Sequence, residues 1–162
     1  MQAPDKPKTS PEFAGWLDEI DQAGQLFVPI VALHEISAGV AKLGGKGAKK
    51  KASNLDSWLT GLIRDYNDLI LGYELSTALT AGYLDGNAQA DGHNPGMADV
   101  MIAAIAKEND LTVVTENVKH FTLFVPFGVS VITPDEAAAI FKRARGETPP
   151  AAPHTRRSRP KS

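Results

Sequence analysis

Cysteine is absent from the 162-residue chain, which excludes disulfide bonds and thiolate metal sites. Long apolar runs are also absent, because the longest one, residues 26–33, is far shorter than the ~20 residues of a membrane-spanning helix. The first eight residues contain no apolar core of a secretory signal peptide. Together these absences predict a protein that works in a reducing cytoplasm.

An excess of charge of one sign is missing as well, since the formal net charge is −2. The overall balance therefore gives no electrostatic indication of nucleic-acid binding. Basic residues are nevertheless clustered, with five lysines at positions 42–51 and four basic residues after position 155. Such clusters are most often solvated surface, so composition alone assigns them no role.

The length fits one domain, and amphipathic helices alternate with short apolar segments along it. We predict strands at residues 26–31, 69–71, 111–115 and 129–132, with helices between them and a last helix capped by Thr133. The helix over about 74–84 is expected to end at Asp85-Gly86-Asn87. This alternation predicts an α/β domain with a central parallel sheet.

The two ends of the chain differ in composition from the middle. Residues 1–10 are rich in Pro and Lys and are predicted to be irregular, so the apolar strand that normally opens such a sheet is missing. Residues 146–162 contain mainly Pro, Ala, Ser and Arg and predict a disordered basic tail. The domain itself is therefore expected to span residues 11–145.

Asp99 is the most informative residue, because an ionisable side chain lies at the start of an otherwise apolar helix. Burying a carboxylate without a partner is costly, so this position predicts a nearby counter-charge. Glu35 is expected in the first turn of an earlier helix, and Asn117 follows the strand predicted at 111–115. Ligands of open parallel sheets bind at the carboxyl ends of the strands, where we expect these three side chains to converge.

Two carboxylates and an amide oxygen form a ligand set without nitrogen or sulfur. All-oxygen ligation, with water in the remaining positions, suits Mg²⁺ or Mn²⁺. Such an ion polarises a phosphoryl oxygen and activates bound water, as phosphodiester hydrolysis requires. Glu35, Asp99 and Asn117 therefore predict a divalent-metal site that could support hydrolysis.

Three segments resemble a known family. Residues 97–106 (MADVMIAAIA), 111–121 (LTVVTENVKHF) and 131–134 (VITP) look like the carboxyl half of a PIN domain of the VapC toxin type. The segment IVALHEI around Glu35 resembles the part of that family that carries its second acid. The resemblance covers about residues 13–134, and its most specific part is the block from Asp99 to Phe121.

The resemblance implies a three-layer α/β/α fold and a metal-dependent ribonuclease that forms a homodimer and is neutralised by an antitoxin protein. Glu35 and Asp99 match two metal-binding acids, and Asn117 matches a position where the family has Asp or a polar substitute. Thr115 matches a hydroxyl residue beside the site. The implied substrate is single-stranded or structured RNA, whose phosphates the lysines at 42–51 could hold by charge.

The chain departs from the family at two places. PIN domains begin with a strand that ends in an Asp-Thr-Asn-like motif, and Asp5, bracketed by prolines, does not replace it. His120 stands where many relatives have Asp. Because losing a carboxylate weakens both ion affinity and water activation, we expect an impaired or inactive enzyme; a translation start assigned too far downstream would explain the missing strand.

Two functions remain open at this stage, a metal-dependent endoribonuclease and a catalytically dead PIN remnant that binds RNA or an antitoxin. Each site residue also has a purely structural alternative. Asp99 could satisfy free backbone donors at a helix start, and Glu35 could be a solvated helix carboxylate. Asn117 could be a turn residue, and His120 is expected to be a surface or loop residue and not a ligand.

Overall fold

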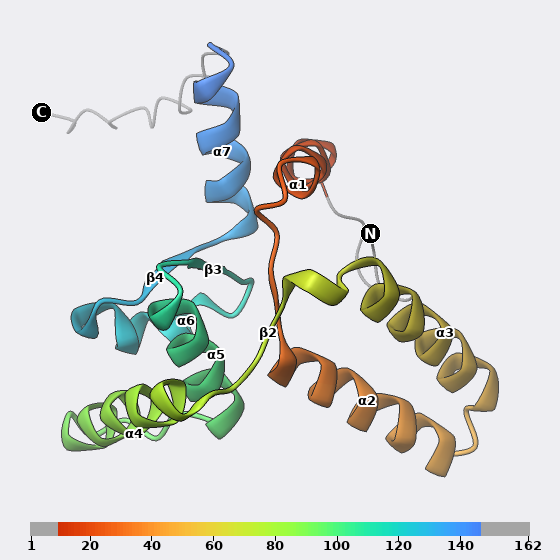
Figure 1. Ribbon diagram of the computed structural model, residues 1–162, viewed down its shortest axis with the longest axis horizontal. Coiled ribbons are helices and arrows are strands. Elements are labelled where there is room, and N and C mark those ends of the chain that lie inside the picture. Colours follow the sequence, from red (N-terminus) through yellow and green to blue (C-terminus); the bar gives the residue numbers. More distant parts are fainter. Residues whose placement is uncertain (1–9, 147–162) are drawn as a thin grey trace, which may run out of the picture.

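The computed structural model describes residues 10–146, which fold into helices and four short strands (Figure 1). Residues 1–9 and 147–162, which include most of the segment predicted to be irregular and nearly all of the predicted basic tail, lie outside the described residues. No helix among the described residues is long and apolar enough to cross a membrane. The helices are α1 (Pro11–Gln22), α2 (Ile30–Gly45), α3 (Lys49–Asp65), α4 (Leu75–Ala90), α5 (Met97–Glu108), α6 (Val118–Phe121) and α7 (Pro134–Ala144), with 3-10 turns η1 (Asn67–Leu69) and η2 (Thr122–Phe127).

The strands are β1 (Val28–Pro29), β2 (Ile70–Leu71), β3 (Thr112–Val114) and β4 (Ser130–Ile132). β1 pairs with β2 and β3 pairs with β4, both in parallel, which confirms the predicted α/β class with parallel strands. Between residues 10 and 146 no strand joins the two pairs, so the sheet is divided at its middle.

The principal core lies in the carboxyl-terminal half, where α4 and α5 pack side by side beneath β3 (Figure 1). Small residues on α5 allow the close approach, because Ala103 and Ala104 are completely buried there. Phe124 of η2 and Leu84 of α4 are also fully buried in this cluster. This half therefore forms a continuous hydrophobic core.

Helix α4 differs from the prediction, since it continues through Asp85-Gly86-Asn87 to Ala90. The turn prediction was wrong because Leu84 and Ala88, on either side of that tripeptide, are both buried in the core. Burial of these two residues outweighs the ~1 kcal/mol helix penalty of a glycine. The Asn87 side chain also donates to the carbonyl of Tyr83, 2.7 Å away, within the helix.

The amino-terminal half is built from helices that extend away from this core. The hairpin of α2 and α3 projects from β1 and β2, and α1 packs against α7 (Figure 1). α1 begins at Pro11 behind a Ser10 cap, whose hydroxyl accepts from the Phe13 amide at 3.2 Å. It ends before Gly24, whose φ of 65° lies in the left-handed region.

Candidate functional site

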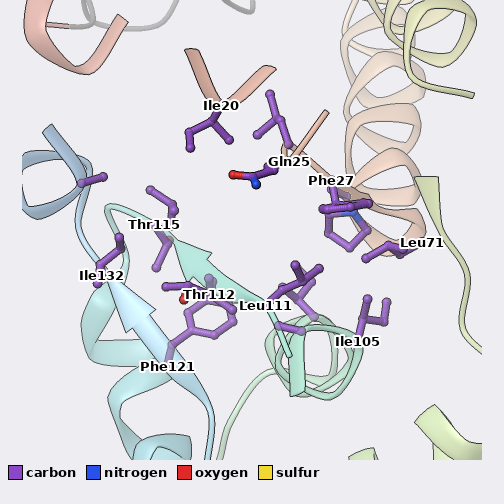
Figure 2. Close-up of a pocket in the computed structure, with 18 of the residues that line it drawn as sticks. Ile20, Gln25, Phe27, Leu71, Ile105, Leu111, Thr112, Thr115, Phe121 and Ile132 are labelled. Atoms are coloured by element: carbon purple, nitrogen blue, oxygen red, sulfur yellow. The ribbon is translucent and has the colours of Figure 1, made fainter. Parts of the chain in front are cut away.

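A cleft of about 830 Å³ lies between the two strand pairs (Figure 2). All three site residues predicted from the sequence line it: Glu35 from α2, Asp99 from α5 and Asn117 from the turn after β3. Thr115 lines it as well. The structure thus brings to one cleft four residues that are spread over 80 positions of the chain.

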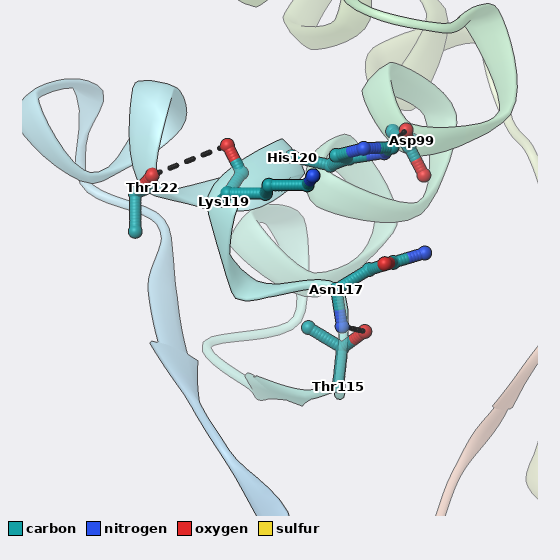
Figure 3. Close-up of polar contacts among 6 residues, drawn as sticks. All are labelled: Asp99, Thr115, Asn117, Lys119, His120 and Thr122. Carbon is teal, nitrogen blue, oxygen red and sulfur yellow. Dashed lines mark hydrogen bonds and ion pairs between the residues drawn. The ribbon is translucent and has the colours of Figure 1, made fainter.

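Asp99 lies in the first turn of α5, where its negative charge faces the positive end of the helix dipole. Its side chain is 25% exposed, and its Oδ2 is 3.2 Å from Nδ1 of His120 (Figure 3). The contact is an ion pair when the imidazole is protonated. His120 is thus the polar side chain that contacts the Asp99 carboxylate.

His120 was not recognised from the sequence as a neighbour of Asp99. It is positioned by α6, a helix of four residues that is too short to produce a recognisable hydrophobic period. α6 packs against α5, which brings the imidazole over the start of that helix. His120 is nearly half exposed, in agreement with its predicted surface location, but its contact makes it part of the site.

Asn117 is held by the backbone around it. The Thr115 amide donates to the carbonyl of Ile132 on β4 at 3.1 Å, and the Thr115 hydroxyl accepts from the Asn117 amide at 3.0 Å. The Asn117 side chain makes no capping bond to α6, and its φ of −87° is not left-handed. The turn therefore uses the backbone of Asn117 and leaves its side-chain amide at the cleft (Figure 3).

Glu35 lies in the second turn of α2. The sequence had predicted the first turn, so that prediction was wrong. The difference arises because β1 is short and the helix begins directly after Pro29, which fixes the backbone of the entry. Glu35 is exposed at the cleft. Because α2 contacts α5, the helices that carry Glu35 and Asp99 are neighbours.

The donor atoms at the cleft are compatible with a hard divalent cation. Glu35 and Asp99 offer carboxylate oxygens and Asn117 an amide oxygen, and Mg²⁺ is commonly held by one or two carboxylates with water completing the shell. Among the described residues there is no group of three His, Cys, Asp or Glu side chains able to hold a metal. Among the described residues that line the cleft, these oxygen donors are therefore two carboxylates and one amide.

The lysine cluster lies elsewhere. Lys42 and Lys46 are at the end of α2, and Lys49 begins α3. Lys46 is eleven residues beyond Glu35, or about 16 Å along a helix axis. The lysines are therefore at the tip of the α2–α3 hairpin (Figure 1). The sequence had suggested a location beside the cleft, and the structure does not place them there.

Comparison with known proteins agrees with this architecture. The model of the PIN domain family matches residues 6–122, which include Glu35, Asp99 and Asn117. The chain belongs to the PIN domain family. The family recognised from the sequence is thereby confirmed, and PIN domains generally use divalent metal ions, which agrees with the oxygen donors at this cleft.

Solved structures share the PIN fold. FitAcB from Neisseria gonorrhoeae is 25% identical with a TM-score of 0.66, covering 82% of this chain and 91% of that one. FitAB bound to a DNA fragment is 24% identical with a TM-score of 0.64, covering 82% and 88%. DNA-bound VapBC from Salmonella typhimurium is 22% identical with a TM-score of 0.62, covering 76% and 86%. No protein in a curated set matches the chain.

Proposed function

We propose that this PIN domain is a metal-dependent endoribonuclease of the VapC toxin type that hydrolyses RNA phosphodiesters. The observation that carries the proposal is the convergence of Glu35, Asp99 and Asn117 on one cleft of a chain that belongs to the PIN family. The domain is proposed to span residues 11–145. The absence of cysteine supports a cytoplasmic location.

In this proposal Glu35, Asp99 and Asn117 hold Mg²⁺ or Mn²⁺ through their oxygen atoms. The bound ion supplies Lewis-acid polarisation of the scissile phosphate and a more acidic attacking water. Thr115 fixes the backbone of Asn117 through their 3.0 Å hydrogen bond, and His120 orients one oxygen of Asp99. Thr115 and His120 are thus positioning residues.

The proposed protein partner is a cognate antitoxin. FitAB, FitAcB and VapBC are the named subjects of similar structures, and VapBC is a toxin–antitoxin pair. The proposed substrate is single-stranded or structured RNA. Contacts of that RNA with Lys42 and Lys46 would lie about 10 Å and about 16 Å from Glu35 along α2, away from the scissile bond.

We also propose a homodimer, formed through an exposed apolar stripe on α4. Leu75, Leu79 and Tyr83 are spaced by four residues and are 79%, 70% and 56% exposed. A row of three large apolar side chains on one helix face is typical of a protein interface. We expect Leu79→Lys to convert the dimer to a monomer in sedimentation analysis; a wild-type monomer at micromolar concentration would contradict the proposal.

The nuclease proposal is tested by incubating the purified protein with single-stranded RNA and Mn²⁺. We expect Asp99→Asn, which removes charge but preserves shape, to lower cleavage by at least about a hundredfold, because a lost charge contact of 3 kcal/mol or more reaches that size. Glu35→Gln should act in the same direction. Titration calorimetry with Mn²⁺ should show weaker binding in both variants.

The matched control is Asp56→Asn, the same substitution at an exposed position of α3 that does not line the cleft. It should cleave as the wild type does. Cleavage that survives Asp99→Asn, or that Asp56→Asn removes equally, would refute the site assignment. Cleavage by a contaminating nuclease would be the same in preparations of Asp99→Asn, Glu35→Gln and Asp56→Asn.

A second candidate is a catalytically dead PIN domain that binds RNA or an antitoxin. The observation that favours it is the small number of acids, since among the described residues Glu35 and Asp99 are the two carboxylates that line the cleft. This candidate predicts Mn²⁺ or RNA binding without cleavage at any metal concentration. The RNA-cleavage assay separates the two candidates, because only the active nuclease is expected to produce cleaved RNA.

A further inference from the structure

The tip of the α2–α3 hairpin carries a concentrated positive charge (Figure 1). Five lysines within ten positions are exposed there, and they form a tip cluster of Lys42, Lys46, Lys49, Lys50 and Lys51. No Asp or Glu occurs between Glu35 and Asp56. Of the 17 basic residues in the chain, the other 12 stand against 19 acidic ones, so the rest of the chain has a formal charge of −7.

The charge of the tip cluster is not neutralised by neighbouring carboxylates. Four of its lysines form no ion pair with another described residue, namely Lys42, Lys46, Lys49 and Lys50. Lys142 of α7, by contrast, is paired with Glu12 at 3.3 Å. A group of unpaired ammonium ions on one protruding tip favours a partner with many negative charges.

Local stability does not explain where these lysines lie. Lys49, Lys50 and Lys51 form the first turn of α3, at the positive end of the helix dipole. The N-cap residue is Ala48, which has no side-chain acceptor, and the first turn contains no acidic residue. Cations at this end of a helix oppose its dipole. Residues that break such a local rule are expected at functional positions.

The tip cluster is continuous with the cleft along one side of α2. Lys42 is seven residues after Glu35, which places both side chains on the same side of the helix, about 10 Å apart along its axis. Lys46 follows one turn later, about 16 Å from Glu35. Ala38, on the exposed side of α2 between Glu35 and Lys42, is too small to block this path. An extended polyanion that follows α2 would therefore reach from the tip to the cleft.

The composition of the tip favours a nucleic-acid strand over a protein. None of the large apolar side chains that are exposed among residues 10–146 lies at positions 42–51, so the tip has no apolar anchor of the kind that protein interfaces use. Lysine binds phosphate as a point charge and reads no base. A nucleic-acid strand carries a phosphate roughly every 3.4 Å, so Lys42 and Lys46 match phosphates about three and about five nucleotides from Glu35.

We propose that the tip cluster is a phosphate-binding site for single-stranded RNA, which lies along the exposed side of α2 and reaches the cleft at Glu35. The site supplies affinity and register but no sequence preference. That the bound RNA is also a substrate rests on the proposed nuclease function. Binding at the tip needs neither metal nor cleavage, because the lysines act by charge alone.

The test measures binding of a fluorescein-labelled oligouridine of about 12 nucleotides to the full chain by anisotropy, with EDTA present to prevent cleavage. The tip variant combines Lys42→Gln, Lys46→Gln, Lys49→Gln and Lys50→Gln. The charge-matched control combines Arg156→Gln, Arg157→Gln, Arg159→Gln and Lys161→Gln. We expect at least about tenfold weaker binding in the tip variant and a change below about twofold in the control.

The salt dependence of binding counts the phosphate contacts. Each contact with a single strand contributes about −0.7 to the slope of log affinity against log salt concentration, so the tip variant should have a slope shallower by about 2.8. The control should keep the wild-type slope. An unchanged slope in the tip variant would show that its four lysines do not contact phosphates.

Two single substitutions test the path along α2. Ala38→Glu places a negative charge between Glu35 and Lys42, whereas Ser37→Glu places the same charge at an exposed position about 200° around the helix from Glu35. Only Ala38→Glu should weaken RNA binding, by about threefold or more. Equal weakening by both substitutions would show that the RNA does not follow this side of α2.

The remaining outcomes separate this proposal from its alternatives. The tip variant should melt no lower than wild type, because lysines at the start of α3 oppose the helix dipole; if it melts lower, the pair Ala38→Glu and Ser37→Glu decides the question. Equal loss of binding in the tip variant and the charge-matched control would show that net charge and not the tip holds RNA. A polyglutamate peptide that binds as tightly as RNA of equal charge would assign the tip to an acidic protein and overturn the proposal. RNA binding that depends on the tip in a protein without cleavage activity would refute the nuclease proposal alone.

Discussion

The two halves of the molecule differ in how their apolar residues are used. In the carboxyl-terminal half, α4, α5, β3 and η2 enclose a cluster in which Leu84, Ala103 and Phe124 are completely buried. In the amino-terminal half, α1 has no buried residue and α2 has only Val31. The carboxyl-terminal half has a continuous core, whereas the amino-terminal helices meet it mainly through the contacts of α2 with α5 and of α1 with α7.

The difference in burial between the halves indicates which part of the fold can hold site residues in fixed positions. Asp99, Thr115 and Asn117 are all attached to the half with the continuous core, whereas Glu35 is carried by the hairpin arm. Local stability follows burial, so α2 is expected to open more often than α5. We therefore expect hydrogen exchange to be slower at the α5 side of the cleft, the firm wall, than at the α2 side.

The largest expected effect is loss of the firm wall. Phe124→Ala removes a fully buried aromatic ring that packs edge-on against Phe121 at a centroid distance of 6.4 Å. Truncation of a buried Phe costs about 3–5 kcal/mol in the free energy of unfolding. Urea denaturation should show this loss as one cooperative transition; a change below about 1 kcal/mol would contradict the idea of a continuous core.

A smaller and more local effect on stability is expected in the α2–α3 hairpin. Leu59→Ala on α3 truncates one of its few buried residues and should cost about 2–3 kcal/mol. Amide exchange should accelerate in α2 and α3 and stay unchanged in α5. Equal acceleration in α5 would show that the two halves unfold together and that the comparison above is wrong.

The sequence was sufficient to predict the class of fold because α5, β3, β4 and α7 have clear periods and caps. The Thr133–Glu136 capping box, for example, is present as predicted. The prediction from the sequence was wrong at residues 85–87, where tertiary burial of Leu84 and Ala88 overrides local turn preference. Strand lengths were overestimated, since β1 is two residues long and not six.

For the site, the sequence predicted that Glu35, Asp99 and Asn117 lie close together, and all three line the cleft; their role as metal ligands stays a prediction. It could not identify the His120–Asp99 contact, which depends on how α6 packs against α5. Nor could it place the lysines at 42–51 correctly, because their distance from Glu35 follows from the length of α2. Both results depend on three-dimensional packing and not on local pattern.

A polar contact between the end of α3 and α1 makes the stability of the amino-terminal half depend on pH. Burial, followed by the hydrogen bond to the Asp21 carboxylate, raises the pKa of Tyr66 from 10.0 to about 12. A raised folded-state pKa favours the neutral hydroxyl, so this stabilisation is complete below pH 10 and is lost as pH rises towards 12. Tyr66→Phe should cost about 1–2 kcal/mol at pH 8.

That cost should shrink between pH 10 and pH 12, because the phenylalanine variant has no group to titrate there. The measurement is the difference in unfolding free energy between wild type and Tyr66→Phe across this range. A constant difference for Tyr66→Phe would rule out this contribution.

The smallest expected effect concerns α7, which contacts α1 and contains the buried residues Ala137 and Ala138. Thr133→Ala removes the hydroxyl that accepts from the Glu136 amide at 3.0 Å and should cost about 1 kcal/mol. Thr133→Ser preserves that oxygen and should cost less. Because the cap acts on α7 first, faster exchange should appear in α7 and α1 while α5 keeps its protection; loss of protection in α5 alone would show that α7 stabilises the core and not the arm.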